Sequence, residues 1–156
     1  LKKHPELRGK DLNTAMSSCR KLIGKPVSIL NYPEGTRFTL KKHSKTKSSY
    51  QNLLRPRAGG VHTVLSSLGE QLTGLLDVTI VYPGNSSPSL WDFLRGKVKR
   101  IVVRINNFKI GEGKIPSIKM LRSNAGPSLV RNLLNEFWEE KDFFINEMHK
   151  KQNKKK

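Results

Sequence analysis

The sequence predicts an α/β domain in which a mixed sheet is flanked by helices, with a long amphipathic helix near the C-terminal end. Three short runs, residues 27–32, 75–82 and 97–105, have the length and the branched, apolar composition of strands. Segments with apolar residues at helical spacing lie between and after these runs. The order strand, turn, helix, strand, helix, strand is typical of α/β domains.

The first predicted element is a helix over residues 12–23. Asp11 can cap its N-terminus, and Gly24 with Pro26 would end it. Cys19 is expected to be a small core residue, because buried cysteines are usually inert. The predicted buried face of the helix comprises Leu12, Ala15, Met16, Cys19 and Ile23.

The strand at 27–32 leads into a turn that displays Glu34, Gly35, Thr36 and Arg37. Ligand sites in open α/β sheets lie at the carboxyl ends of strands. Gly35 lets the backbone approach a ligand closely or take a positive φ. Arg37 offers a planar fork of donors that can hold a phosphate, and Glu34 could orient it or accept a bond from a substrate hydroxyl. The alternative is a strand-end turn with a solvated ion pair.

Residues 40–51 are predicted to form a basic loop that carries Lys41, Lys42, Lys45 and Lys47. The loop is either simply solvated or in contact with the phosphates of lipid headgroups or of coenzyme A.

Gly59 and Gly60 precede a stretch with apolar residues at helical spacing, Val61 to Leu72. A helix that begins after a glycine pair offers free N–H groups and partial positive charge to an anion, and Arg57 stands beside it. Alternatively, the glycines only allow the helix to pack tightly on the sheet. His62 is interpreted as an ordinary helical residue.

A buried strand is predicted at 75–82, followed by a loop at 83–88. Ser89 can cap a short helix, Leu90 to Leu94. The apolar residues of this helix are Trp91, Phe93 and Leu94. They either belong to the core or enter a bilayer interface, where Trp is favoured.

The strand at 97–105 has one partly basic face, with Arg100 and Arg104, which we expect to meet water or lipid headgroups. Residues 111–127 are predicted to be an irregular connector, poor in core signals, between a domain at 1–110 and a C-terminal segment at 128–156. Ser128 opens the long helix, which ends in a cationic tail at 150–156. Such a tail either solubilises the chain or gains about 1 kcal/mol per basic residue at an anionic membrane.

The amino-acid composition limits the classes of partner that the chain is expected to bind. Among 156 residues, 30 Lys and Arg oppose 12 Asp and Glu, which gives a formal net charge of +18. This balance indicates an anionic partner: nucleic acid, anionic lipid headgroups or a polyphosphate such as coenzyme A. The single Cys19 excludes an internal disulfide and a cysteine-based zinc cluster. No apolar run approaches the roughly 18 residues that a membrane span requires.

Three blocks in fixed order resemble motifs of the glycerolipid acyltransferases, the family of 1-acylglycerol-3-phosphate acyltransferase. Residues 33–37, Pro-Glu-Gly-Thr-Arg, resemble the block of that sequence in the family. Residues 54–60 resemble its Leu-x-Pro-Lys-x-Gly-Gly element, with Arg57 in place of the usual Lys. Residues 78–83 resemble its apolar strand that ends in Pro. The flanks at 4–7 and 91–94 are most similar to a bacterial inner-membrane branch, and the resemblance covers roughly residues 1–110.

The resemblance implies transfer of an acyl chain to a lysophospholipid such as 1-acylglycerol-3-phosphate at the cytoplasmic face of the inner membrane. It implies no metal and no cofactor beyond acyl-coenzyme A or acyl carrier protein as the donor. Arg37 would bind the acceptor phosphate, and Arg57 would add positive potential. The other implied residues shape the pocket (Glu34, Gly35, Thr36), line the helix start (Gly59, Gly60) or wall an acyl channel (Val78, Ile80, Pro83).

One family motif is missing from the chain. The family's His-x-x-x-x-Asp pair supplies a general base for the acceptor hydroxyl, but no Asp stands five positions after His4, His43, His62 or His149. We therefore interpret the chain as the distal part of a longer acyltransferase, inactive alone. The alternative is a non-catalytic basic module that binds anionic lipid or nucleic acid. Specific nucleic-acid binding is not expected, because base-stacking strands, zinc spacing and a clean basic helix face are missing.

Overall fold

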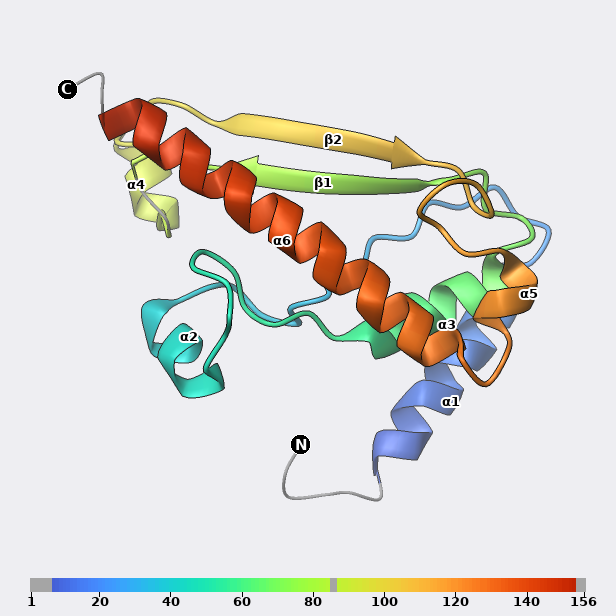
Figure 1. Ribbon diagram of the computed structural model, residues 1–156. Coiled ribbons are helices and arrows are strands. Elements are labelled where there is room, and N and C mark those ends of the chain that lie inside the picture. Colours follow the sequence, from blue (N-terminus) through green and yellow to red (C-terminus); the bar gives the residue numbers. More distant parts are fainter. Residues whose placement is uncertain (1–6, 85–86, 154–156) are drawn as a thin grey trace. The chain divides into compact units, whose positions relative to one another are not determined.

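The computed structural model describes residues 7–84 and 87–153 (Figure 1). The described elements are α1 (Leu7–Arg20), α2 (Leu40–Thr46), α3 (Ala58–Leu68), β1 (Leu75–Val81), α4 (Leu90–Leu94), β2 (Val102–Phe108), α5 (Ile118–Leu121) and α6 (Gly126–Asn153). They fall into two compact units. Unit 1 takes its described residues from Leu1–Gly35, Arg57–Leu75 and Phe108–Leu134, and unit 2 from Thr36–Pro56, Leu76–Asn107 and Asn135–Lys156.

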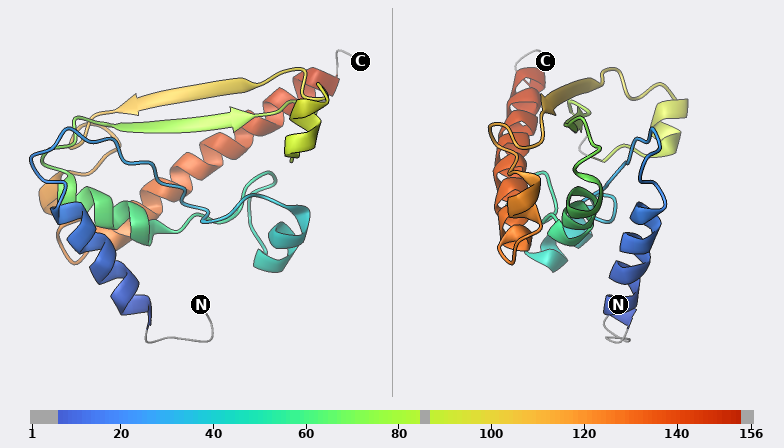
Figure 2. Two further views of the ribbon diagram at one scale, coloured as in Figure 1. Left: turned by 180° about the vertical axis from the view of Figure 1, so that it is seen from behind. Right: turned by 90° about the vertical axis from the view of Figure 1, so that its right-hand side faces the viewer.

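Unit 1 is helical. α3 contacts both α1 and α5 (Figure 2). The side chain of Gln71 joins the segments that follow α1 and α3: its Oε1 accepts from the Gly24 N–H at 2.8 Å, and its Nε2 donates to the Leu22 carbonyl at 3.1 Å. Apart from glycines, the buried residues of this unit are Cys19, Val61, Thr63, Leu65, Leu68, Ile115, Leu121, Val130, Leu133 and Leu134.

Unit 2 consists of the antiparallel pair β1–β2, the two short helices α2 and α4, and α6 from Asn135 onward (Figure 1). α6 contacts β1 through the buried Lys141, whose Nζ pairs with the Asp77 carboxylate and donates to the Val78 carbonyl at 2.9 Å. It contacts the segment before α3 through Trp138, whose Nε1 donates to the Leu54 carbonyl at 2.9 Å. These contacts fix α6 against both a strand and a loop of its own unit.

The exposure of the two faces of the sheet is the opposite of what was predicted. Arg104, expected at water or headgroups, is half-buried; its guanidinium lies 4.3 Å from the centre of the Phe144 ring and donates to the Glu140 carbonyl. The opposite face is exposed and apolar, so β1 is not the buried strand that was predicted. We call this the outer sheet face; it comprises Leu76, Val78, Ile80, Val103 and Ile105.

Several predicted boundaries are wrong. Residues 27–32 form no strand, because a strand requires a hydrogen-bonded neighbour and these residues have no ladder partner in the described part of the chain. Asp11 lies inside α1 rather than at its cap, because the helix begins at Leu7; the side chains of 7–13 lie outside the description. The second strand begins at Val102 rather than at Lys97.

Two segments predicted to be irregular contain structure. Residues 40–46 form α2, where the Thr39 hydroxyl accepts from the Lys42 N–H at 3.3 Å as an N-cap. The segment 111–127 contains α5, and Ile115 and Leu121 are almost fully buried, so it is not poor in core residues. The predicted helix at 90–94 is confirmed, as are the Ser89 cap and the burial of Cys19. The long C-terminal helix is also confirmed, but it begins at Gly126 rather than at Ser128.

Candidate functional site

The turn that precedes residue 36 is closed by a backbone hydrogen bond. The Gly35 N–H donates to the Tyr32 carbonyl at 2.9 Å, and Gly35 has a φ of +69°. A residue with a Cβ is strained in this left-handed region, which explains why glycine stands there. The expectation that Gly35 supplies a positive φ is confirmed.

Arg57 brings the second sequence block against this turn. Its backbone N–H donates to the Pro33 carbonyl at 2.9 Å. Its Nη1 lies 3.6 Å from the position that a Cβ on Gly35 would take, so the guanidinium covers the open face of the glycine. Residues 33–35 and 57, separated in sequence, thus form one structure, and the exposed guanidinium presents positive charge there.

The start of α3 lies next to the same turn. Arg57 occupies the N-cap position with extended backbone and makes no side-chain cap, so the first-turn N–H groups are not satisfied by a cap. Gly59 and Gly60 lie inside the first turn, not before it. A Cβ at Gly60 would stand 3.1 Å from Asn31 Nδ2, whereas a Cβ at Gly59 would meet nothing within 4 Å. Asn31 therefore lines the helix start, a role that sequence reasoning did not assign.

Thr36 and Arg37 begin unit 2, where a lysine holds them. Lys42 Nζ, from the first turn of α2, donates to the Thr36 hydroxyl and, at 3.3 Å, to the Arg37 carbonyl. The Arg37 side chain is exposed. Sequence reasoning placed Lys42 among four equivalent loop lysines, but α2 directs this one to the motif.

The structure gives the positions of the remaining predicted site residues, and their roles stay predictions. Glu34 is half-buried, and its role toward Arg37 or a hydroxyl stays a prediction. Val78 and Ile80 lie on the outer sheet face, and Pro83 is half-buried. The acyl channel that they were predicted to wall also stays a prediction.

The described histidines each contact main-chain groups. The Nε2 of His43 lies 2.6 Å from the Tyr50 carbonyl, and that of His62 lies 2.9 Å from the Leu121 carbonyl. His149 Nδ1 accepts from the Gly84 N–H at 3.2 Å. His4 lies outside the described residues. These contacts agree with His62 as an ordinary helical residue.

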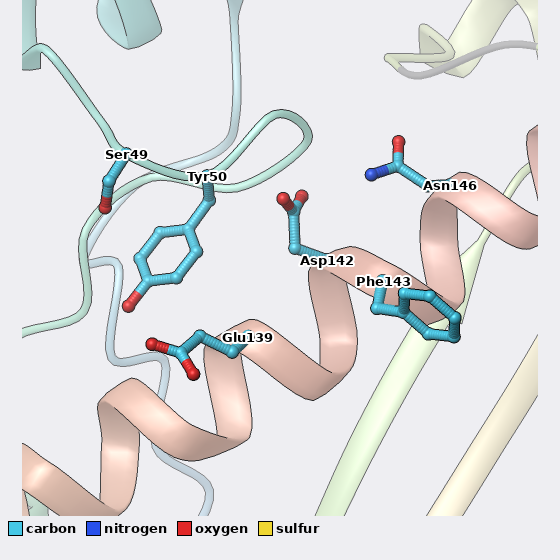
Figure 3. Close-up of a pocket in the computed structure, with 6 residues that line it drawn as sticks. All are labelled: Ser49, Tyr50, Glu139, Asp142, Phe143 and Asn146. Carbon is cyan, nitrogen blue, oxygen red and sulfur yellow. The ribbon is translucent and has the colours of Figure 1, made fainter.

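An open depression of about 340 Å³ in unit 2 is lined by Ser49, Tyr50, Glu139, Asp142, Phe143 and Asn146 (Figure 3). Burial, reinforced by the charge of Glu139, raises the pKa of Tyr50. Asp142 accepts from the N–H groups of Gln51 and Asn52 at 2.8 and 2.7 Å, which fixes the loop. The carboxylates of Glu139 and Asp142 make this depression unsuitable for a phosphate. None of the predicted site residues lines it.

Within residues 7–84 and 87–153, His, Cys, Asp and Glu side chains nowhere gather into a group that could ligate a metal ion. The helices over the same residues are all too short or too polar to span a bilayer.

The chain is similar to curated acyltransferases over most of its length. It is 30% identical over 150 residues to the mouse 1-acyl-sn-glycerol-3-phosphate acyltransferase gamma, a match that covers 90% of the chain and 37% of that relative. The human protein of the same name is 27% identical over 150 residues, with 90% and 40% covered. The mouse acyltransferase epsilon is 26% identical over 113 residues, with 60% and 30% covered.

The chain therefore spans about two fifths of the length of the gamma relatives. No protein-family model and no solved structure matches it.

Proposed function

Because the chain belongs to the glycerolipid acyltransferase family, we propose that it is the distal part of an enzyme that acylates a lysophospholipid. The acceptor would be 1-acylglycerol-3-phosphate, named in the curated relatives, and the donor acyl-coenzyme A or acyl carrier protein. The reaction joins the acceptor hydroxyl oxygen to the acyl carbonyl carbon, and the thiol of the donor leaves with the hydroxyl proton.

The observation that carries the proposal is the contact between the two motif blocks. The Pro33 carbonyl and the Arg57 N–H hold residues 33–35 against the start of α3, and the Arg57 guanidinium covers Gly35. A phosphate at this position would meet a permanent cation and the N–H groups of an uncapped first turn. Gly59, beside which nothing lies within 4 Å of a Cβ, leaves room for it.

This chain would bind and orient the acceptor rather than remove its proton. An alcohol is a weak nucleophile at neutral pH, and the family's His-x-x-x-x-Asp base is missing from this sequence. We assign Arg57 to the acceptor phosphate together with the α3 start, and Arg37, whose carbonyl accepts from Lys42 Nζ, to a phosphate of the acyl donor.

We also propose an anionic membrane surface as partner and the cytoplasmic face of the inner membrane as location. The net charge of +18 favours the anionic surface, because acidic lipids attract clustered Lys and Arg, and the location is the one that the resemblance of the flanks at 4–7 and 91–94 implies. The end of the cationic tail, 154–156, lies outside the described residues.

The first test is the intact mass of the native polypeptide, recovered from its source cells with an antibody against this chain and mapped by peptides. A mass well above 17.7 kDa, with a His-x-x-x-x-Asp peptide, is expected. The recovered polypeptide should transfer labelled acyl groups to 1-acylglycerol-3-phosphate, whereas the isolated chain should not.

Within the native polypeptide, Arg57→Gln should raise KM for the acceptor roughly 10- to 150-fold, the value of a lost hydrogen bond to a charged group. Arg57→Lys should recover part of this loss, and Lys25→Gln, a control at an exposed lysine outside the two motif blocks, should have no effect. Equal KM values for wild type and Arg57→Gln would remove Arg57 from the site. Absence of transfer above a heat-killed control would contradict the enzyme.

The second candidate is a non-catalytic basic module, for which the charge of +18 is the specific observation. A native mass of 17.7 kDa and no acyl transfer would favour it. RNA binding that falls steeply with salt is expected of any protein with this charge and would not distinguish the two. A sequence preference retained at high salt would.

A further inference from the structure

α4 presents an apolar face to solvent. Leu90, Trp91 and Leu94 are 70, 65 and 68% exposed. At about 100° per residue these three side chains fall within one sector of roughly 100°, and Asp92 projects from the opposite side of the helix. Large apolar side chains gathered on one helix face at this exposure indicate a surface that meets an apolar phase.

The exposure is a property of a fixed helix, not of a frayed one. The Ser89 hydroxyl accepts from the Asp92 N–H at 3.2 Å, and the Asp92 carboxylate accepts from the Ser89 N–H at 2.9 Å, which is a complete capping box. Phe93 packs edge-on against Tyr82, with ring centres 5.5 Å apart. The helix is thus held by Phe93 and its cap while the other three apolar residues face outward.

A dense run of cations follows directly. Arg95, Lys97, Lys99 and Arg100 are all exposed. Between residues 87 and 101 they oppose a single acid, Asp92, which is engaged in the cap and lies 3.8 Å from Lys97. Four basic residues against one acidic give this short segment a net charge of +3 next to its apolar face.

We propose that residues 89–100 dock on the surface of an anionic bilayer. Leu90, Trp91 and Leu94 enter the boundary between headgroups and acyl chains, and the basic residues contact lipid phosphates. Nucleic acid is disfavoured as the partner, because two of the three outward side chains are aliphatic and cannot stack on bases. The proposal gives the membrane partner proposed above a surface, but it requires neither acyl transfer nor the motif turn.

The two tryptophans of the chain allow a direct test. Trp91 is exposed, whereas Trp138 is buried and donates to the Leu54 carbonyl. The purified chain is mixed with vesicles of phosphatidylcholine alone or mixed with phosphatidylglycerol, each with and without brominated acyl chains. Trp91 emission should shift to the blue and be quenched by brominated lipid only in the anionic vesicles. Trp138→Phe should retain the signal, and Trp91→Phe should lose it.

Two sets of variants separate insertion from diffuse attraction. Leu90→Ser with Leu94→Ser should weaken vesicle binding at least tenfold, whereas Phe143→Ser, at an exposed apolar side chain on α6, should not. Lys99→Gln and Arg100→Gln should each weaken binding to anionic vesicles about fivefold, against no change for Lys25→Gln. Circular dichroism confirms that each variant is folded.

The proposal is overturned if the chain sediments with anionic vesicles while Trp91 stays unquenched, because another surface then binds. It is also overturned if Lys25→Gln weakens binding as much as Lys99→Gln, if quenching is equal in neutral vesicles, or if RNA binds and vesicles do not. None of these measurements uses an acyl donor or a lysophospholipid, so failure of the proposed enzyme activity would be seen separately.

Discussion

Gly35 and Arg57 show how much a single residue can decide in this chain. Gly35 has a positive φ, and the space where its side chain would stand is the face against which the Arg57 guanidinium lies. The 3.6 Å separation is an ordinary van der Waals contact, so a methyl group would fit there. The cost of a substitution at Gly35 is therefore conformational rather than steric.

Gly35→Ala should lower the free energy of unfolding by about 1–2 kcal/mol, the cost of a left-handed non-glycine residue. Urea denaturation followed by circular dichroism measures the change. The matched control is Gly59→Ala in the first turn of α3, where a Cβ meets nothing within 4 Å. That substitution should be neutral or stabilise by up to about 1 kcal/mol. Equal losses in both variants would show that the turn does not depend on the φ of Gly35.

Tyr50 should make stability depend on alkaline pH. Its pKa is raised, first by burial and then by the charge of Glu139, above the ordinary value of 10.0. The folded state therefore holds the phenolic proton more tightly than the unfolded state. This contribution is complete below pH 10 and is lost as the pH rises through the raised pKa.

Urea denaturation at a series of alkaline pH values should show this loss in the wild type and a weaker one in Tyr50→Phe. The substitution should have little effect near neutral pH, because the Tyr50 hydroxyl makes only a long hydrogen bond, 3.5 Å, to Asn135 Oδ1. Identical slopes in the two proteins would exclude Tyr50 as the titrating group.

Among the elements, α6 contacts β1 through a buried charge. The side chains of Lys141 and Asp77 are 6 and 11% exposed, and Lys141 Nζ also donates to the Thr79 hydroxyl at 3.0 Å. Two residues on the buried face of β1, Asp77 and Thr79, are thus polar, and both contact this one lysine. The charged pair therefore lies on the buried face of the sheet, beside the buried Val81, while the outer sheet face is apolar and exposed.

Lys141→Met should destabilise unit 2 by about 3–5 kcal/mol, because it leaves the Asp77 carboxylate buried without its cation. Replacing both partners, Lys141→Met with Asp77→Leu, should recover most of this loss, since an apolar pair of similar volume needs no counter-charge. Thermal and urea unfolding measure both. A double variant as unstable as the single one would mean that the lysine acts through its hydrogen bonds to Val78 and Thr79.

At the scale of the whole molecule, charge and apolar surface oppose each other. The outer sheet face would favour association with another chain, while a net charge of +18 repels other copies. Added salt screens the repulsion but leaves the apolar attraction. The balance between the two should therefore shift toward association as the salt concentration rises.

Sedimentation velocity should show self-association that increases with salt, and Val103→Thr with Ile105→Thr should reduce it without loss of stability. Threonine keeps the branched shape that suits a strand. Val81→Thr, on the buried face, is the contrasting variant and should destabilise instead. Association that weakens with salt would point to electrostatic contacts and away from the outer sheet face.

Elements with a local signal were predicted from the sequence. The spacing of residues predicts both the apolar stripe of α6 and the Ser89 cap of α4, and the structure contains both. The strand at 27–32 was predicted wrongly because composition does not identify a hydrogen-bonding partner. Arg104 was assigned to water because its contact with Phe144 joins residues far apart in sequence.

In the candidate site, too, some residues were predicted from the sequence and others were not. The motif residues Gly35 and Arg57 were recognised from contiguous blocks, although their direct contact required the structure. Asn31 and Lys42 had no local signal, because their places depend on α3 and α2. Ile115 was missed as a core residue because it stands alone among glycine and polar neighbours. It is not part of a periodic apolar pattern that would predict its burial.

The lone cysteine has a practical consequence. Cys19 is buried in unit 1, on the helix that contacts α3, and the chain has no second thiol to compete with it. A thiol reagent can reach it only when the side chains that cover it move apart, either locally or as the unit unfolds. The modification rate of the unaltered protein therefore reports how often this part of unit 1 opens, and its dependence on denaturant distinguishes local from global opening.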